Sequence, residues 1–110
     1  MPKFGKRSKK EIATAHPDLQ TLFNEAIKTV DFTVICGHRA REDQEKAFMS
    51  GASRLHWPKS KHNKTPSLAV DVIPFPFKGW ENVDEFQNLA VAVKETAERL
   101  KIRVAWGGDW

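Results

Sequence analysis

The sequence has 110 residues, of which 40% are hydrophobic and 29% charged, and this composition excludes a disordered tail or a repeat array and indicates one globular domain. Its net charge of +4 is compatible with a polyanionic partner, such as nucleic acid or the anionic bacterial wall, or with solubility alone. The single cysteine, Cys36, excludes an intrachain disulfide and a zinc cluster made of cysteines only.

The first half of the chain predicts a helix, a strand and a second helix. Apolar residues recur at helical spacing over residues 19–30. Residues 32–36 are β-branched and aromatic, which favours a strand, and we interpret Cys36 within it as a small buried core residue. Residues 41–50 are rich in helix formers, and Gly51 marks their end.

A long loop and a strand are predicted next. Residues 52–67 are basic, polar and broken by prolines, so we expect a long loop, which in a compact domain is often functional. The apolar run 68–73 predicts a strand with Asp71 near its centre, where a carboxylate usually needs a partner. The closely spaced prolines of residues 74–80 exclude a central strand or a helix there.

The last part of the chain predicts a long amphipathic helix and a final strand. Apolar residues recur at helical spacing from residue 83 to residue 100. Asn82, with Glu85 three residues later, resembles a capping box. Residues 102–106 are typical of a strand.

His62 and Asp71 are candidate zinc ligands. A catalytic zinc site uses three protein ligands and an open position, and histidine and aspartate are suitable donors. The nine-residue separation requires the loop to fold back along the strand. The alternatives on residue chemistry alone are a surface histidine and an aspartate that pairs with an arginine or caps a turn.

A set of short motifs occurs in order along nearly the whole chain. The motifs are Gly37-His38-Arg39 with Gln44, Gly51-Ala52-Ser53, Ser60-Lys61-His62-Asn63, Pro66-Ser67, Ala69-Val70-Asp71-Val72 and Trp106-Gly107-Gly108-Asp109-Trp110. Together they resemble one known family, the zinc D-Ala-D-Ala carboxypeptidases and L-alanyl-D-glutamate endopeptidases, and within it the small phage-type endolysins. The family fold, shared with hedgehog N-terminal domains, implies an α+β structure in which a small antiparallel sheet packs with helices.

The resemblance implies a role for five residues. His62 and Asp71 match two zinc ligands, and Arg39 matches the arginine that stabilises the oxyanion during attack of water on the scissile carbonyl. On residue chemistry alone, Arg39 could instead pair with a surface carboxylate such as Asp43 or Glu42. Gln44 and Ser60 are interpreted as donors that contact the substrate or support the ligands, or else as a helix-surface residue and a loop cap.

In the family, the third ligand is a histidine beyond the Trp106–Trp110 motif, preceded by the acidic general base. The sequence ends at Trp110, so we expect one peptidase-like domain over residues 1–110 that lacks the C-terminal strand with both groups. His16, His38, His56 and Asp109 are conceivable substitutes for them.

The implied function is hydrolysis by a zinc metallopeptidase of an amide bond in the peptide stem of peptidoglycan, with cleavage at L-Ala-D-Glu favoured over D-Ala-D-Ala. Aromatic side chains could line a cleft for that stem or could simply pack in the core and turns. The alternatives are a truncated, inactive relative that binds the cell-wall peptide without cleaving it, and a basic nucleic-acid-binding domain, which explains none of the motif order. The aromatic residues are Trp57, Phe75, Phe77, Trp80 and Trp106.

Localisation and partners follow from this function. No apolar run approaches the ~20 residues of a membrane span, and no hydrophobic signal segment follows the basic residues 1–10. We therefore expect cytoplasmic synthesis without a signal peptide and action on the bacterial cell wall after release. The expected partner is the peptidoglycan stem peptide, with no specific nucleic acid, and we expect a monomer.

Overall fold

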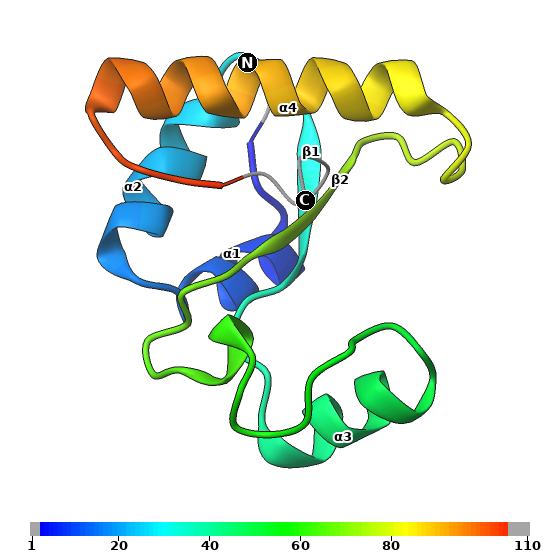
Figure 1. Ribbon diagram of the computed structural model, residues 1–110. Helices are drawn as coiled ribbons and strands as arrows, with labels where there is room; N and C mark the ends of the chain where they lie inside the picture. Colours follow the sequence, from blue (N-terminus) through cyan, green and yellow to red (C-terminus); the bar gives the residue numbers. More distant parts are fainter. Residues whose placement is uncertain (1–2, 106–110) are drawn as a thin grey trace.

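A two-stranded antiparallel sheet with helices packed around it forms the α+β fold expected from the sequence (Figure 1). The structure, a computed structural model, describes residues 3–105. In chain order the elements of the described residues are α1 (Lys6–Ile12), α2 (Pro17–Ala26), β1 (Phe32–Cys36), α3 (Arg41–Met49), the short 3-10 helix η1 (Lys61–Asn63), β2 (Asp71–Pro74) and α4 (Val83–Leu100).

Helix α1 has no counterpart among the predicted elements. Its sequence is mostly basic and polar, so it gives little apolar periodicity, and tertiary contacts rather than an amphipathic stripe hold it against β1. Its buried Ser8 Oγ accepts a hydrogen bond of 3.0 Å from the backbone N–H of Val34, and its Ile12 is part of the hydrophobic core. The N-terminal segment therefore supports the strand that leads to the site.

Helices α2 and α3 confirm the predictions for their regions. Helix α2 begins at Pro17, where the Nδ1 of His16 accepts a hydrogen bond of 3.0 Å from the N–H of Asp18, and it ends at Ala26, four residues before the end of the apolar stripe. Helix α3 ends at Met49, and Gly51 follows with φ +83°, a conformation that glycine adopts without strain.

Helix α4 confirms the predicted long helix, but the predicted capping box is absent. Asn82 occupies the N-cap position without a side-chain hydrogen bond to the helix. Glu85 instead pairs with Lys78 across 3.1 Å, so its carboxylate is held by the preceding connection and does not reach back to the cap. The helix ends with Lys101 in the left-handed conformation.

The hydrophobic core lies where α2 and α4 pack together and α4 meets the sheet (Figure 1). The side chains of Leu22, Val34 and Leu89 are fully buried and come from α2, β1 and α4. The core therefore fixes the orientation of β1. None of the described helices has the length and apolarity needed to cross a bilayer.

Replacing Leu89 with alanine is expected to lower the free energy of unfolding by about 2–5 kcal/mol, because it removes apolar contacts and leaves a cavity. The control is Val91→Ala on the exposed face of the same helix, where the change should be within about 0.5 kcal/mol. Urea unfolding followed by circular dichroism measures both. Equal losses in the two variants would contradict the position of the core.

Strand β1 pairs with β2 in a register that contains one irregularity. Val34 lies opposite Val72, whereas Cys36 lies opposite Asp71, so β1 has one more residue than β2 between these two pairs. Such a bulge changes the direction of nearby side chains and is common beside active sites. Cys36 and Asp71 are thereby placed across from each other at one end of the sheet.

Two predicted strands differ from the observed ones. Asp71 is the first residue of β2 rather than its centre, because residues just before it are held elsewhere: the N–H of Ser67 bonds to the Thr14 carbonyl and that of Leu68 to the Lys61 carbonyl. The predicted strand at 102–106 is wrong for residues 102–105, which form no strand ladder. The motif at 106–110 lies outside the described residues.

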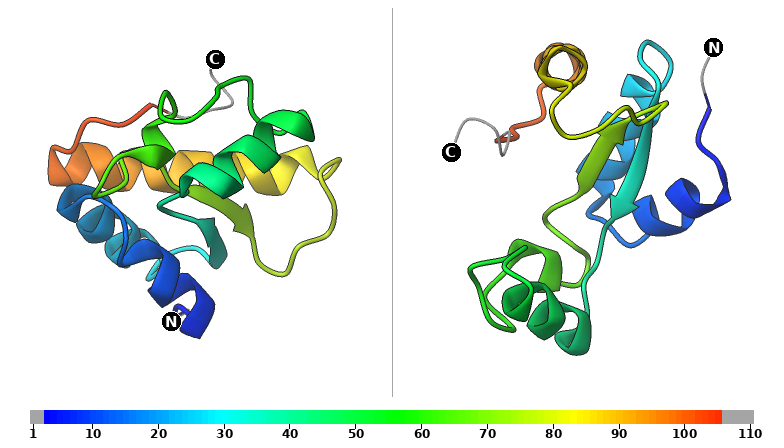
Figure 2. Two further views of the ribbon diagram at one scale, coloured as in Figure 1. Left: turned by 90° about the horizontal axis from the view of Figure 1, so that it is seen from below. Right: turned by 90° about the vertical axis from the view of Figure 1, so that its right-hand side faces the viewer.

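Helix α3 and the loop with η1 lie beside each other at the end of the sheet remote from α4 (Figure 2). Only Gln44 of α3 is fully buried. The long loop predicted at 52–67 is confirmed, with η1 as its one helical turn. The sheet end that carries Cys36 and Asp71 therefore faces this polar region.

Candidate active site

His62 and Asp71, which the sequence predicts as zinc ligands, lie together at the end of the sheet. The Nε2 of His62 is 3.4 Å from the Oδ1 of Asp71. Zinc bonds of about 2.0–2.3 Å at tetrahedral angles separate two donor atoms by roughly 3.3–3.8 Å. The loop therefore folds back along the strand as the prediction requires, and the two donor atoms lie at a separation that suits one ion.

Cys36 is the third member of this cluster. One ligand atom from each of Cys36, His62 and Asp71 lies within 4.8 Å of the others. Imidazole, carboxylate and thiolate are all ligands that zinc accepts, so the donor set fits this metal. Among the residues that the structure describes, no other group of three histidines, cysteines or acidic residues has this arrangement.

The ring of His62 is oriented by the backbone around it. Its Nδ1 lies 2.7 Å from the carbonyl oxygen of Gly37, so a proton on Nδ1 is donated to that carbonyl and Nε2 faces Asp71. A ligating histidine commonly has such a partner on its second nitrogen, because the partner fixes the tautomer and the ring plane. The histidine is buried at 8% exposure, which further limits its rotation.

The electrostatics of the pair favour a cation between the two side chains. Burial lowers the pKa of His62, but hydrogen bonding to Asp71, Cys36 and the Gly37 carbonyl, together with the Asp71 charge, outweighs burial and raises this pKa to about 10. Burial raises the pKa of Asp71, but His62 and the Arg39 charge lower it further, so the net shift is downward. A metal ion would replace the proton on Nε2, because only a neutral imidazole is a ligand.

Arg39 points its guanidinium at the same carboxylate. One terminal nitrogen donates to the Oδ2 of Asp71 at 3.2 Å, and the other donates to the Oε1 of Gln44 at 3.0 Å. The surface carboxylates of Glu42 and Asp43, considered as alternative partners, are not its partners in the structure. Two of the five N–H donors of Arg39 are engaged by these contacts, so others can serve a bound substrate.

Gln44 and Ser60 form the support for these groups. Gln44 is fully buried, and its amide nitrogen donates to the Ser53 hydroxyl and to the Leu55 carbonyl. Ser60 caps η1, with its hydroxyl accepting a hydrogen bond of 3.2 Å from the N–H of His62. The alternative interpretation of Gln44 as a helix-surface residue is therefore wrong. The alternative interpretation of Ser60 as a loop cap describes its contact in this structure.

Asn63 also belongs to the site, although no role was predicted for it from the sequence beyond its place in the Ser60–Asn63 motif. Its amide nitrogen donates to the Arg39 carbonyl and to the Gln44 side-chain oxygen, and its own oxygen accepts from the N–H of Ser60. In addition, the N–H of Arg39 donates to the His62 carbonyl at 2.7 Å. The predicted ligand loop and the predicted arginine are thus one hydrogen-bonded unit.

Replacing Gln44 with alanine is expected to lower the free energy of unfolding by about 1–3 kcal/mol, because buried donors and acceptors of Asn63 and Leu55 lose their partner. Gln87→Ala, on the exposed face of α4, is the matched control and should change stability by less than about 0.5 kcal/mol. Thermal unfolding measures both variants. A Gln44 variant as stable as the control would show that the network is not structural.

The other histidines do not join the described cluster. His16 caps α2, His56 lies 2.9 Å from the Glu45 carboxylate, and His38 lies 3.4 Å from the Thr65 hydroxyl. Asp109, the fourth conceivable substitute, lies outside the described residues. Among the described residues, the potential donor that lies nearest to His62 and Asp71 is therefore Cys36 and not another histidine.

The prediction that Cys36 is a small core residue differs from the structure. Cys36 is half-buried, stands outside the hydrophobic core, and has its Sγ 3.9 Å from the Nδ1 of His62. A strand pattern alone could not show this, because the bulge that changes the register is not visible in the periodicity. The adjacent Gly37 was the available signal, since glycine in or beside a strand often marks a bulge or a close backbone approach.

The four described aromatic residues that were considered for a cleft lie outside the buried core. Phe75, Phe77 and Trp80 are exposed, and the Trp80 ring stacks on Phe86 with ring centres 5.6 Å apart. Trp57 is half-buried, and its N–H donates to Glu45. Trp106 lies outside the described residues.

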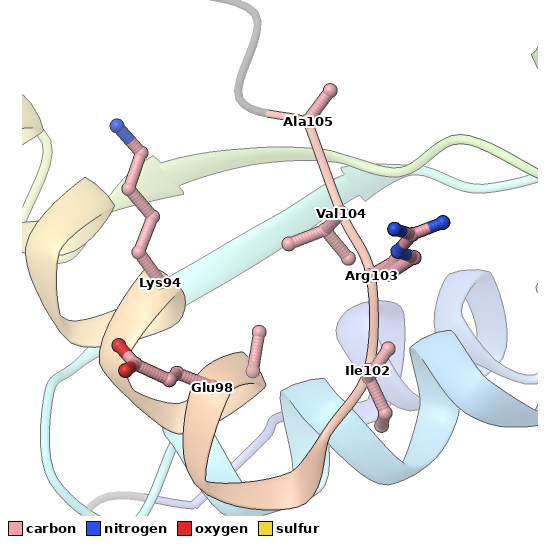
Figure 3. A pocket seen from close by; sticks show the side chains of 7 residues that line it. Lys94, Glu98, Ile102, Arg103, Val104 and Ala105 are labelled. Carbon is pink, nitrogen blue, oxygen red and sulfur yellow. The ribbon is translucent and has the colours of Figure 1, made fainter.

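A hollow of about 520 Å³ lies elsewhere, between the C-terminal half of α4 and the segment that follows it (Figure 3). It includes none of Arg39, His62 or Asp71, so it is separate from the candidate site. Its lining is formed by Lys94, Ala97, Glu98, Ile102, Arg103, Val104 and Ala105.

Three comparisons with known proteins find similar proteins over nearly the whole chain. The family model described as phage L-alanyl-D-glutamate peptidase matches residues 1–110. The L-alanyl-D-glutamate peptidase of Escherichia phage T5 is 32% identical over 114 residues, which cover 98% of this chain and 81% of the relative. The crystal structure of the Serratia marcescens L-Ala D-Glu endopeptidase ChiX superposes with a TM-score of 0.80 at 32% identity and covers 97% of this chain and 80% of that one.

Proposed function

Because the chain belongs to the phage L-alanyl-D-glutamate peptidase family, we propose that it hydrolyses the amide bond between L-alanine and D-glutamate in the peptide stem of peptidoglycan. The single observation that supports this most strongly is the meeting of His62, Asp71 and Arg39 at one end of the sheet, because a metal-ligand pair and an anion-stabilising cation are the groups that amide hydrolysis needs.

We further propose that His62 and Asp71 hold a zinc ion. A zinc ion bound there supplies Lewis acidity, which polarises the scissile carbonyl and makes water a stronger nucleophile at neutral pH. The chain's own contribution is the placement of the donors: the Gly37 carbonyl holds Nδ1 of His62, and Arg39 holds Oδ2 of Asp71, so Nε2 and Oδ1 face each other.

Arg39 is the proposed oxyanion-stabilising residue. Its side chain is only 16% exposed and its guanidinium is held from two sides by Gln44 and Asp71, so its position is fixed before the substrate arrives. A preorganised cation in such a site stabilises the charge that develops on the carbonyl oxygen without reorganising at that moment. Gln44 acts through Arg39 as a positioning residue.

Ser60 is proposed to act on the substrate side of the same loop. Its hydroxyl accepts from the N–H of His62, and a hydroxyl group can also donate one hydrogen bond to a carbonyl of the stem peptide. Ser60 is buried at 6% exposure, whereas Gln44 is fully buried and its side-chain oxygen and nitrogen are both bonded to neighbouring residues. The substrate role for Gln44 is therefore proposed only through the position of Arg39.

The remaining proposals concern where and in what form the chain acts. We propose that residues 1–110 belong to a single peptidase-like domain, that the protein works as a monomer, and that it is made in the cytoplasm and acts on the wall after release. The net charge of +4 supports contact with the anionic wall.

The experiment that tests the proposed function is digestion of purified muropeptides with the zinc-loaded chain, followed by mass spectrometry of the products. Cleavage between L-Ala and D-Glu should give a sugar fragment that ends in L-Ala and a free peptide that begins with D-Glu. Release of D-Ala alone would show that the protein cleaves the D-Ala-D-Ala bond of the stem instead. Cosedimentation with peptidoglycan without any product would favour a binding protein and contradict the proposal.

A further inference from the structure

We propose that helix α1 is a docking surface for peptidoglycan, on which exposed lysines bind the carboxylates of stem peptides beside the one that is cleaved. This inference rests on the proposed function and deepens it, because it assigns the contact with the wall to one element of the fold. The lysines are Lys6, Lys9 and Lys10.

The distribution of charge along the chain is the first support. Residues 1–12 contain five of the 18 lysines and arginines and one of the 14 acidic residues, so they carry the whole net charge of +4. Residues 13–110 contain thirteen charged residues of each sign and are neutral overall. Lysines there can pair with nearby acidic residues, as Lys28 does with Glu25 across 2.9 Å. Attraction to a polyanion is therefore expected at the N-terminal segment rather than over the whole surface.

The two faces of α1 are the second support. Ser8 and Ile12 lie four residues apart on the buried face, whereas Lys6 and Lys10, also four residues apart, lie on the exposed face. Within the described residues, the side chains of Lys6, Lys9 and Lys10 form no ion pair or hydrogen bond. Like charges four residues apart are unfavourable in a helix, and the first turn holds no acidic residue that could offset them. An external anion would relieve this repulsion.

The position of α1 is the third support, because the helix packs against β1, the strand that leads to the candidate site (Figure 1). The N–H of Gly37 donates to the Glu11 carboxylate at 3.2 Å, and the carbonyl of Gly37 holds the ring of His62. The Thr14 hydroxyl, just after α1, accepts a hydrogen bond of 2.7 Å from the N–H of His38. A contact between α1 and the wall would therefore hold the wall next to the site.

The chemistry of the stem favours peptidoglycan over nucleic acid as the partner. D-glutamate has two carboxyl groups, and a peptide that continues through one of them leaves the other free, so each stem presents an anion. Lysine suits such separate carboxylates, because its ammonium group is a compact point charge on a flexible stem. No aromatic residue lies in α1, and the neighbouring Phe4 is buried, so the lysines have no accompanying platform for stacked bases.

The test compares two triple variants that lower the net charge by the same amount. Lys6→Gln/Lys9→Gln/Lys10→Gln removes the lysines of α1, and the control Lys28→Gln/Lys46→Gln/Lys101→Gln removes three exposed lysines elsewhere. Cosedimentation with purified peptidoglycan at low salt, with zinc chelated to prevent digestion, measures binding. The α1 variant should bind about tenfold more weakly than the wild type, and the control should stay within about twofold. Equal binding by the two variants overturns the inference.

Hydrolysis of a soluble muropeptide separates docking from catalysis. Both zinc-loaded variants should cleave it at the wild-type rate, because the three lysines contribute no group to the candidate site. A slower rate in the α1 variant alone would show that the lysines act on the reaction and would overturn the docking role. If the wild-type chain does not cleave the muropeptide either, the proposed function fails, whereas cosedimentation still tests the docking surface.

A third measurement identifies the anion with the wild-type chain alone, so it does not depend on the folding of a variant. Amidation of the wall carboxylates with carbodiimide and ammonia should abolish cosedimentation, whereas removal of phosphate polymers with hydrofluoric acid should leave it unchanged. The opposite result overturns the assignment to stem carboxylates. Tighter binding to duplex DNA than to peptidoglycan at the same salt concentration overturns the choice of partner.

Discussion

Replacing Asp71 with asparagine is expected to remove zinc from the chain and to lower kcat/KM for stem-peptide hydrolysis by ~100-fold or more. This decrease is larger than the decrease expected when a residue that only supports a metal ligand is replaced. The asparagine keeps the size of the side chain but removes the charge that faces both His62 and Arg39. Zinc content by atomic emission and kcat/KM with a purified muropeptide measure the two effects.

Asp84→Asn is the matched control for this prediction. Asp84 is an exposed aspartate in the first turn of α4, remote from the ligand cluster, so its amide should leave zinc content and hydrolysis within about twofold of the wild type. A fully active Asp71→Asn protein with normal zinc content would exclude Asp71 as a ligand. Circular dichroism of both variants separates the loss of metal from the loss of fold.

Arg39→Lys is expected to lower kcat by ~10²–10³-fold while zinc content stays unchanged. Lysine keeps the charge, but its single ammonium group cannot reach Gln44 and Asp71 with the two-sided geometry of the guanidinium, so the cation is no longer held in place. Single-turnover hydrolysis measures the chemical step, and metal analysis measures the site.

The control for Arg39→Lys is Arg41→Lys, an exposed position at the start of α3 that is two residues away. This variant should hydrolyse the stem peptide at the wild-type rate. If Arg39→Lys also kept the wild-type rate, its contact with Asp71 would be a salt bridge that only supports the fold. A loss of zinc in Arg39→Lys would instead show that Arg39 acts through the ligand Asp71.

The elements with strong apolar periodicity could be predicted from the sequence, and those held by tertiary contacts could not. Helix α4 and strand β1 begin and end close to the predicted residues, because each presents an apolar pattern that the core buries. Helix α1 has no such pattern, and it depends on the contact between Ser8 and β1. Residues 102–105 have β-branched character but lack a neighbouring strand.

The site was predictable in its residue identities but not in its geometry. The motifs indicated Arg39, His62 and Asp71, and the structure brings these three residues together. Arg39 pairs with Asp71, and Cys36 lies near them, because β1 contains a bulge and the loop folds back along the strand. Neither the bulge nor the folded loop produces a hydrophobic periodicity, so the sequence pattern did not predict these contacts. The buried environment of Gln44 likewise comes from the loop that closes over α3.

The measurement that tests the central claim most directly is the rate of L-Ala-D-Glu cleavage by the wild-type chain as zinc is returned after chelation. We expect no cleavage in the chelated chain and a rate that rises with added zinc to a plateau at one equivalent. His62→Ala should remain inactive at one equivalent of zinc. Cleavage that persists in the fully chelated chain, or is equal in His62→Ala, would contradict the claim that His62 and Asp71 form a zinc peptidase site.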